Sequence, residues 1–219
     1  MKNPRRSVEH DGVDYWVGWP TIMDLYEKAE KMDKSGSREG RHGLYFAVLF
    51  ELGARVGEIL QLRPDMFQWN RDMIVVRRVP VFKRRRRHTR NVYIKREGDP
   101  LSAKLIEYVQ RCDTKFLLPG FTPFTGEVEP SRHVSAATVY NTVTGIDPGV
   151  WPHWLRDQRS WQLSAPPERG GRGFDAYLLK AWFEWGSLSM PAHYAGRRSE
   201  KDILAALGVD EALVPKQQQ

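Results

Sequence analysis

The sequence has 219 residues, of which 41% are hydrophobic and 11% aromatic, which excludes a disordered chain and predicts a folded protein with a real core. Lys and Arg outnumber Asp and Glu by 34 to 27, so the formal charge is +7, which favours a polyanionic partner such as nucleic acid. The single cysteine, Cys112, excludes an intrachain disulfide and a thiolate metal site, and no apolar segment suits a membrane span or a signal peptide. We therefore expect no membrane association and a location in the cell interior.

Apolar residues at helical spacing predict helices along most of the chain. In chain order they are expected over residues 21–32, 41–52, 56–62, 101–111, 135–144, 151–163, 174–185 and 203–207. Segments rich in Val, Ile and Phe predict two strands, 73–82 and 91–95, joined by the basic run Lys83–His88 as a hairpin with a cationic tip. Segments with several Pro and Gly, 116–130 and 165–173, are expected to be loops.

These elements predict an α+β fold, mostly helical, with a small antiparallel sheet or hairpin. Residues 1–19 have no clear period and are expected to form an arm or linker. Residues 20–210 are expected to form one domain, and residues 211–219 a polar tail. No internal repeat and no second domain of comparable size are indicated.

Three separate segments carry residues suited to phosphodiester chemistry. A transfer that uses no metal needs a nucleophile, cations around the phosphate, and an acid for the leaving oxygen. Arg55 and Glu58 are three residues apart and can share a helical face, and His153 has the same spacing to Arg156. Tyr194 follows a proline in a segment with little apolar periodicity, which indicates an exposed side chain. The plainer interpretations are two solvated pairs and an ordinary surface tyrosine.

The order of these segments resembles the tyrosine recombinase (phage integrase) family. Gly53-Ala-Arg-Val-Gly-Glu58 is similar to the family's Gly-x-Arg-x-x-Glu-Leu motif, and His153-Trp-Leu-Arg156 to its His-x-Leu-Arg motif. Arg90-Asn-Val-Tyr-Ile94 looks like the strand that follows the family's hairpin lysine. Trp185 stands at the family's His or Trp position, and Tyr194 follows nine residues later. The resemblance covers about residues 20–200, and its wording looks most like archaeal and archaeal-virus integrases.

The resemblance implies a function and a set of site residues. The function is site-specific cleavage and rejoining of DNA through a 3′-phosphotyrosyl intermediate. The implied catalytic residues are Arg55, Lys83, His153, Arg156, Trp185 and Tyr194, supported by Glu58. The implied DNA-binding residues are Arg84, Arg85, Arg86, Arg87 and Arg90.

Each catalytic residue takes a role from the same resemblance. Tyr194 would attack the scissile phosphate, and the two motif arginines would hold its non-bridging oxygens. His153 and Trp185 would support the phosphate through ring N–H donors. Lys83 would protonate the departing 5′-oxygen, although the neighbouring arginines blur that assignment because Lys83 is two residues further from Arg90 than is usual. No metal or cofactor is implied, because the phosphotyrosine bond conserves the energy for rejoining.

The expected partner is a double-stranded DNA attachment site. The family implies a tetramer on two duplexes with a Holliday-junction intermediate, and a monomer is possible without DNA. The sequence departs from the family at Asp157, where a His is common, and at Glu184, where a Gly is usual. It also has only about 19 residues before the catalytic pattern, where the family usually carries a separate core-binding domain.

Three other functions stay open from the sequence. One is a DNA-relaxing enzyme like the type IB topoisomerases, and another is a catalytically weak DNA-binding relic of the family. The third is an RNA-binding protein that uses residues 83–87, for which Tyr194→Phe would have no biochemical effect.

Overall fold

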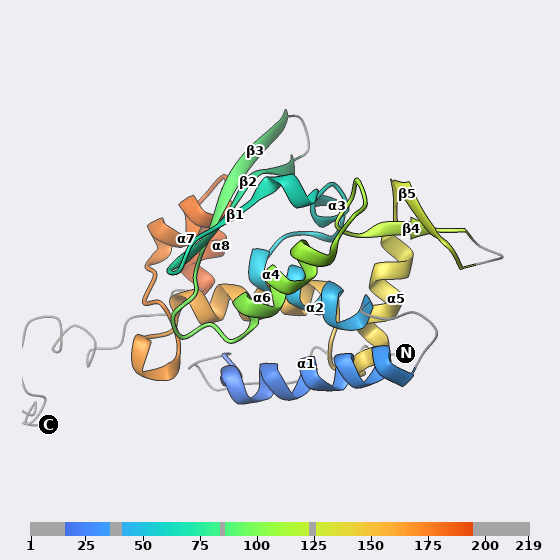
Figure 1. Ribbon diagram of the computed structural model, residues 1–219. Helices are drawn as coiled ribbons and strands as arrows, with labels where there is room; N and C mark the ends of the chain where they lie inside the picture. The colour runs from blue at the N-terminus through green and yellow to red at the C-terminus, as the bar shows by residue number, and fades with distance from the viewer. Residues whose placement is uncertain (1–15, 36–40, 84–85, 123–125, 195–219) are drawn as a thin grey trace, which may run out of the picture.

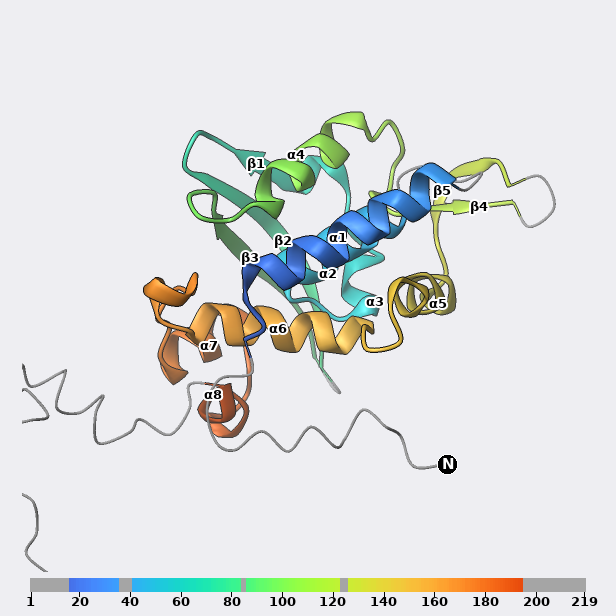
Figure 2. The same ribbon diagram turned by 90° about the horizontal axis from the view of Figure 1, so that it is seen from below.

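The computed structural model describes residues 16–35, 41–83, 86–122 and 126–194. Helix α2 (Arg41–Leu52) lies at the centre of this part of the chain, and every one of its residues from Tyr45 to Leu52 is buried. Around it pack α1 (Gly18–Ser35), α4 (Leu101–Arg111), α5 (Ala136–Ile146) and α6 (Pro152–Ser164). Figure 2 shows α1 crossing α2 on one side, with α6 running alongside.

A three-stranded antiparallel sheet covers the other side of this helical layer (Figure 1). Its order is β1 (Phe67–Trp69), β2 (Met73–Lys83) and β3 (Arg86–Lys95), and β2 pairs with β3 from Met73↔Lys95 to Lys83↔Arg86. The inward face carries the alternating apolar residues that a half-buried strand requires, namely Ile74, Val76, Val79, Val81, Val92 and Ile94. The predicted basic hairpin is thus present, and its strands run up to its tip.

The remaining elements complete the chain. Short α3 (Val56–Ile59) and the 3₁₀ turn η2 (Pro64–Met66) lead into the sheet, and β4 (Pro119–Phe121) pairs with β5 (Val128–His133) in a second hairpin that projects beyond α5 (Figure 1). The 3₁₀ turn η3 (Pro167–Arg169), α7 (Ala176–Phe183) and α8 (Ser189–Tyr194) follow α6. The α+β prediction is confirmed.

Several boundaries differ from the sequence-based expectations. The segment 116–130 was expected to be a loop, but it contributes β4 and part of β5. Each of these short strands is stabilised by pairing with the other, and neither sequence indicates a strand by itself. Residues before the expected boundary at residue 20 already contact the rest of the fold, because the indole of Trp16 is buried and donates to the Arg169 carbonyl at 3.0 Å. The helix expected over 203–207 and the tail lie outside the described residues.

Candidate active site

The first sequence motif lies at the junction between α2 and α3. After Leu52, Gly53 adopts a positive φ of 50°, and a Cβ at this position would stand 2.7 Å from Cε1 of Phe183. Both the conformation and the space therefore require glycine. Arg55 is the N-cap residue of α3. Its backbone N–H and its Nη1 each donate a 2.9 Å hydrogen bond to the Glu58 carboxylate.

The Glu58 carboxylate holds this junction to the sheet as well. It is 1% exposed and also accepts a 3.4 Å hydrogen bond from the backbone N–H of Phe82, near the end of β2. The Arg55 side chain, by contrast, is 44% exposed. A solvated surface pair is therefore excluded, because a buried carboxylate orients a guanidinium whose other face is open to solvent.

Arg156 approaches the same carboxylate from α6. Its side chain is 4% exposed, its Nη1 lies 4.0 Å from Oε2 of Glu58, and the same nitrogen donates to the Gly53 carbonyl. Within the described part of the chain, its Nη2 is buried and has no hydrogen-bond partner. A buried guanidinium donor without an acceptor is costly, so this nitrogen is suited to an incoming anion.

Arg55 and Arg156 bring two positive charges to the site. Burial, and then the nearby charge of Arg55, lower the pKa of Arg156 to about 10, while the charge of Glu58 opposes the shift. Arg156 is therefore still charged at neutral pH. Both guanidinium groups contact the Glu58 carboxylate, and the buried Nη2 of Arg156 has no hydrogen-bond partner among the described residues, so this pair of arginines suits a phosphate oxygen.

Tyr194 lies near enough to Arg156 for the charge of that arginine to act on its phenol, but it is not the exposed side chain that the sequence indicated. It is 6% exposed, because its ring stacks on Trp185 at 5.4 Å between centroids and meets the edge of Trp161 at 5.0 Å. Its hydroxyl donates a 2.6 Å hydrogen bond to Oδ1 of Asp157. Local aromatic packing, which a weak apolar period does not reveal, explains the difference.

The surroundings of Tyr194 keep its hydroxyl protonated at neutral pH. Burial, followed by the hydrogen bond to Asp157, raises the pKa of the phenol well above its ordinary value of 10.0, and the positive charge of Arg156 acts in the opposite direction. Attack by this oxygen therefore requires an acceptor for its proton.

Trp185 and His153 border the same site. Trp185 is 9% exposed and lies between the ring of Phe183, at 4.5 Å, and that of Tyr194, so it fixes the plane of the tyrosine. The His153 side chain is 64% exposed, and its Nε2 lies 3.7 Å from Oδ1 of Asp157. The structure thus brings Arg55, Glu58, His153, Arg156, Trp185 and Tyr194 into one region.

Arg90 is placed differently from the expectation that it contacts DNA. It is 4% exposed, its Nη2 donates to the Leu52 carbonyl at 2.8 Å, and its Nη1 donates to the Trp182 carbonyl. Burial, and then the charge of Arg156, lower the pKa of Arg90 to about 10. The prediction of a DNA-facing Arg90 is therefore wrong for this structure, where the side chain joins β3 to the ends of α2 and α7.

The basic hairpin is only partly described. Lys83 and Arg86 pair across its end through their backbones, whereas Arg84 and Arg85 lie outside the described residues, as do the side chains of Lys83, Arg86 and Arg87. At the base of this tip, His88 forms an ion pair with Glu184. Glu184 has a left-handed φ of 51° at the end of α7, the position where a glycine is usual in the family it resembles.

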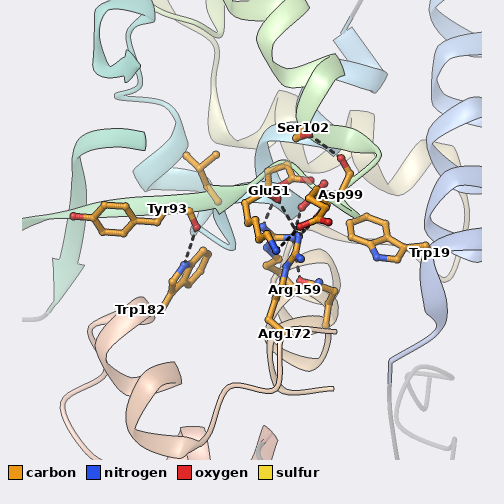
Figure 3. Close-up of polar contacts among 12 residues, drawn as sticks. Trp19, Glu51, Tyr93, Asp99, Ser102, Arg159, Arg172 and Trp182 are labelled. Carbon is orange, nitrogen blue, oxygen red and sulfur yellow. Dashed lines mark hydrogen bonds and ion pairs between the residues drawn. The ribbon is translucent and has the colours of Figure 1, made fainter. Parts of the chain in front are cut away.

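A buried ionic cluster fixes α6, the helix that carries His153, Arg156 and Asp157. Figure 3 shows Arg159 between Glu51 of α2 and Asp99, which precedes α4. The Arg159 nitrogens lie 3.1 Å from each carboxylate, and none of the three side chains is more than 2% exposed. Because Arg159 lies one helical turn after Arg156, this cluster sets the position of the guanidinium that faces the site.

Asp157 is the residue that the sequence analysis noted without giving it a role. Its position offered a signal, since it directly follows Arg156 and lies four residues after His153 on the same helix.

The described residues hold no group of three or more His, Cys, Asp and Glu side chains that could bind a metal ion. No helix in the same ranges is long and apolar enough to cross a membrane.

Comparisons with known proteins bear on the fold. No protein-family model matches the sequence, and no curated protein matches it significantly. Among solved structures, the XerH site-specific recombinase in a pre-cleavage complex with its difH substrate matches with a TM-score of 0.53 and 17% identity, over 85% of this chain and 51% of that one. The XerA recombinase matches with a TM-score of 0.55 and 15% identity, over 88% and 62% of the two chains.

A third match is the Tn1549 transposon integrase in complex with circular intermediate DNA, with a TM-score of 0.55, 11% identity, and 90% and 66% coverage. This chain has the fold of a tyrosine recombinase catalytic domain. It spans between about half and two thirds of the length of these three proteins. At such low identity the comparisons show the fold alone, and the chemistry depends on this chain's own residues.

Proposed function

We propose that the chain is a site-specific DNA recombinase or integrase that cleaves and rejoins strands through a covalent bond between Tyr194 and a DNA 3′-phosphate. The observation that carries this proposal is the juxtaposition of two arginines with a tyrosine hydroxyl. Arg156 has a buried Nη2 without a partner in the described structure, and Arg55 presents a half-exposed guanidinium beside it. The charge of Arg156 also acts on the phenol of Tyr194, and we propose that a phosphodiester held by both arginines is within reach of the phenol oxygen.

The proposed reaction balances without an outside reagent. The Tyr194 oxygen attacks phosphorus, the bond to the 5′-oxygen breaks, and that oxygen takes up a proton as it leaves. Arg55 and Arg156 stabilise the charge that builds on the non-bridging oxygens, a contribution that fixed donors make most strongly in a partly dehydrated site. Rejoining reverses each step, so the bond energy is kept and neither a nucleotide nor a metal is consumed.

Three further assignments complete the proposed site. Lys83 is the proposed acid for the 5′-oxygen, since an arginine is a poor proton donor. His153 and Trp185 are proposed to donate ring N–H groups to the phosphate. Arg84–Arg87 are proposed to contact DNA phosphates from the hairpin, which is consistent with the net charge of +7.

The partner and the assembly are proposed from the neighbours' chemistry. The XerH structure is a complex with its difH substrate, and the Tn1549 integrase structure contains circular intermediate DNA. For this chain we propose a double-stranded attachment site, a tetramer on two duplexes, a Holliday-junction intermediate, and a location with the cell's DNA in the cytoplasm. Kinship with archaeal and archaeal-virus integrases is also a proposal, which rests on the motif wording alone.

A nicked suicide substrate tests this function. Because the DNA site is unknown, we would use a pool of duplexes with randomised central sequence and a nick near the cleavage position, and recover protein–DNA adducts under denaturing conditions. The wild type is expected to form an adduct that Tyr194→Phe abolishes. The matched control is Tyr177→Phe, since Tyr177 is 70% exposed on α7 and has no role in the proposed site.

The outcomes separate the alternatives. Adduct formation followed by strand exchange between two copies of the selected site supports a recombinase. Relaxation of supercoiled DNA without exchange supports a topoisomerase-like activity. The absence of any adduct, with DNA binding intact, supports the relic and contradicts the proposal.

A further inference from the structure

The residue after the second site arginine gives Tyr194 a hydrogen-bond partner. Asp157 stands where a histidine is common in the family that the sequence resembles, so a carboxylate at this position distinguishes this chain from the usual family pattern. Its Oδ1 accepts the Tyr194 hydroxyl hydrogen at 2.6 Å, which is short for a hydrogen bond between two oxygens and typical of an ionised acceptor. The bond joins α6 to α8 through two residues that are 37 positions apart along the chain.

We propose that Asp157 is the general base that takes the proton from Tyr194 when the phenol oxygen attacks phosphorus, an inference that rests on the proposed function. The phenol is buried and protonated, so its proton has to move as the new bond forms. The carboxylate is already in contact with that proton. A general base must lie within about 2.6–3.2 Å of the atom it serves, and Asp157 meets this condition before any DNA is bound.

Titratable and charged groups from α6 and α8 surround Asp157. Its side chain is 29% exposed, and its charge interacts with that of Arg156, the preceding residue on α6. Nε2 of His153, also on α6, lies 3.7 Å from Oδ1. From the other elements, Tyr194 and its neighbour His193 come from α8, and Trp185 covers the tyrosine ring.

The hydroxyl of Ser160 also acts on the phenol, and its effect on the Tyr194 pKa is opposite to that of Asp157. Ser160 donates a 2.9 Å hydrogen bond to the Arg156 carbonyl, and because its neutral hydroxyl is a much weaker base than a carboxylate, it is not a suitable acceptor for the tyrosine proton. Among the described groups that act on the phenol oxygen, Asp157 is therefore the one with an anionic acceptor in place.

The proton balance closes within the site. During cleavage the O–P bond to Tyr194 forms, the phenol proton moves to Asp157, the bond to the 5′-oxygen breaks, and that oxygen takes a proton from Lys83, the proposed acid. During rejoining the 5′-hydroxyl attacks phosphorus and gives its proton back to Lys83, while the tyrosine oxygen leaves and takes its proton from Asp157. The aspartic acid that exists in between is neutral, so it does not repel the DNA phosphate while the covalent intermediate persists.

The test measures single-turnover cleavage by the full chain with Asp157→Asn, on the DNA site selected with wild type. Asparagine keeps an acceptor oxygen for the tyrosine but removes the base. We expect cleavage at pH 7 to fall about 10²–10³-fold, within the usual range for loss of a general base. Asp175→Asn is the matched control, because Asp175 caps α7 through its side chain, Asn caps equally well, and no contact with Tyr194 involves it.

Two further readouts separate a base from a structural role. The rate of Asp157→Asn should rise about tenfold for each unit of pH, since attack then depends on the spontaneously ionised phenol, whereas wild type should change little between pH 7 and 9. On a substrate whose leaving 5′-oxygen is replaced by sulfur, which needs no proton, the defect of Asp157→Asn should persist. A defect in an acid would disappear on that substrate.

Several results would overturn the inference. One is a cleavage rate of Asp157→Asn equal to or above that of wild type, which would mean that Asp157 restrains the Tyr194 hydroxyl. The others are a pH profile of the variant parallel to that of wild type, and rescue of the variant by the sulfur substrate. Thermal unfolding of both variants shows whether the fold is intact, and the pH slope remains diagnostic even if Asp157→Asn is less stable. If wild type itself forms no adduct, the proposed function fails; if only the Asp157 results fail, the function stands without this base.

Discussion

Replacement of Arg159 by methionine is expected to destabilise the protein strongly and in a pH-dependent way. Arg159 is 2% exposed and is paired at 3.1 Å with both Glu51 and Asp99, whose side chains are fully buried. Removal of one partner from a buried ion cluster typically costs about 3–5 kcal/mol, because the remaining charges have no compensation. Here two carboxylates would be left, so we expect a loss in the upper half of that range at pH 7.

The sign of the pH dependence follows from Glu51. Burial already raises the pKa of this carboxyl well above its ordinary value of 4.5, and the Arg159 charge is the main opposing effect. Loss of that charge raises the pKa further. A group whose pKa is raised by folding favours the folded state at low pH and loses that contribution as the pH rises, so the deficit of Arg159→Met should shrink as the pH falls from 7 towards 5.

Urea unfolding followed by tryptophan fluorescence measures this deficit at each pH. The triple variant Glu51→Gln, Asp99→Asn, Arg159→Met is the control, because it removes the charges together and should recover part of the lost stability. A loss below 1 kcal/mol at pH 7, or a deficit that grows as the pH falls, would mean that the buried ion cluster does not stabilise the position of α6.

Three other substitutions test the site. Arg156→Lys should slow single-turnover cleavage by about 10²–10³-fold with little change in DNA affinity, because a lysine cannot bond Gly53 and offer a second fixed donor; unchanged cleavage would remove Arg156 from the site. Arg90→Met should lower the free energy of unfolding by about 2 kcal/mol or more, since the Leu52 and Trp182 carbonyls lose their donors, and a variant of wild-type stability with weaker DNA binding would contradict its structural role. Arg84→Ala combined with Arg85→Ala should reduce the slope of log affinity against log salt by about 1–2, measured by fluorescence anisotropy; an unchanged slope would exclude these phosphate contacts.

The sequence predicted the helical core and the hairpin because both follow from local patterns. The helix over 41–52 has a continuous apolar run and a glycine stop, and the strands on either side of Lys83–His88 have the alternation that β2 and β3 show on their inward face. The pairing of β4 with β5 was missed, since it depends on contacts between segments whose own sequences indicate loops.

The candidate site was predictable in its residue types but not in their environment. Order and spacing along the chain indicated Arg55, Arg156 and Tyr194. The burial of Tyr194 was not indicated, because it arises from Trp161 and Trp185, which come from α6 and from the turn between α7 and α8. Long-range packing of this kind leaves no periodic signal in a six-residue helix such as α8.

The environment of Arg90 was likewise not predictable from the sequence. Its position in a basic segment indicated a DNA contact, yet its side chain turns inward to the carbonyls that end α2 and α7. Whether an arginine on a strand faces solvent or the core depends on the register of that strand, and the bulge between Val76 and Val79 shifts that register just before the partner of Arg90.

Mapping of the attachment point shows whether Tyr194 is the residue that becomes bonded to DNA. The adduct from the suicide substrate would be digested with protease and nuclease and its peptide sequenced by mass spectrometry. We expect a single modified peptide that carries a nucleoside 3′-phosphate on Tyr194. Attachment at another residue, or through a 5′-phosphate, would contradict it.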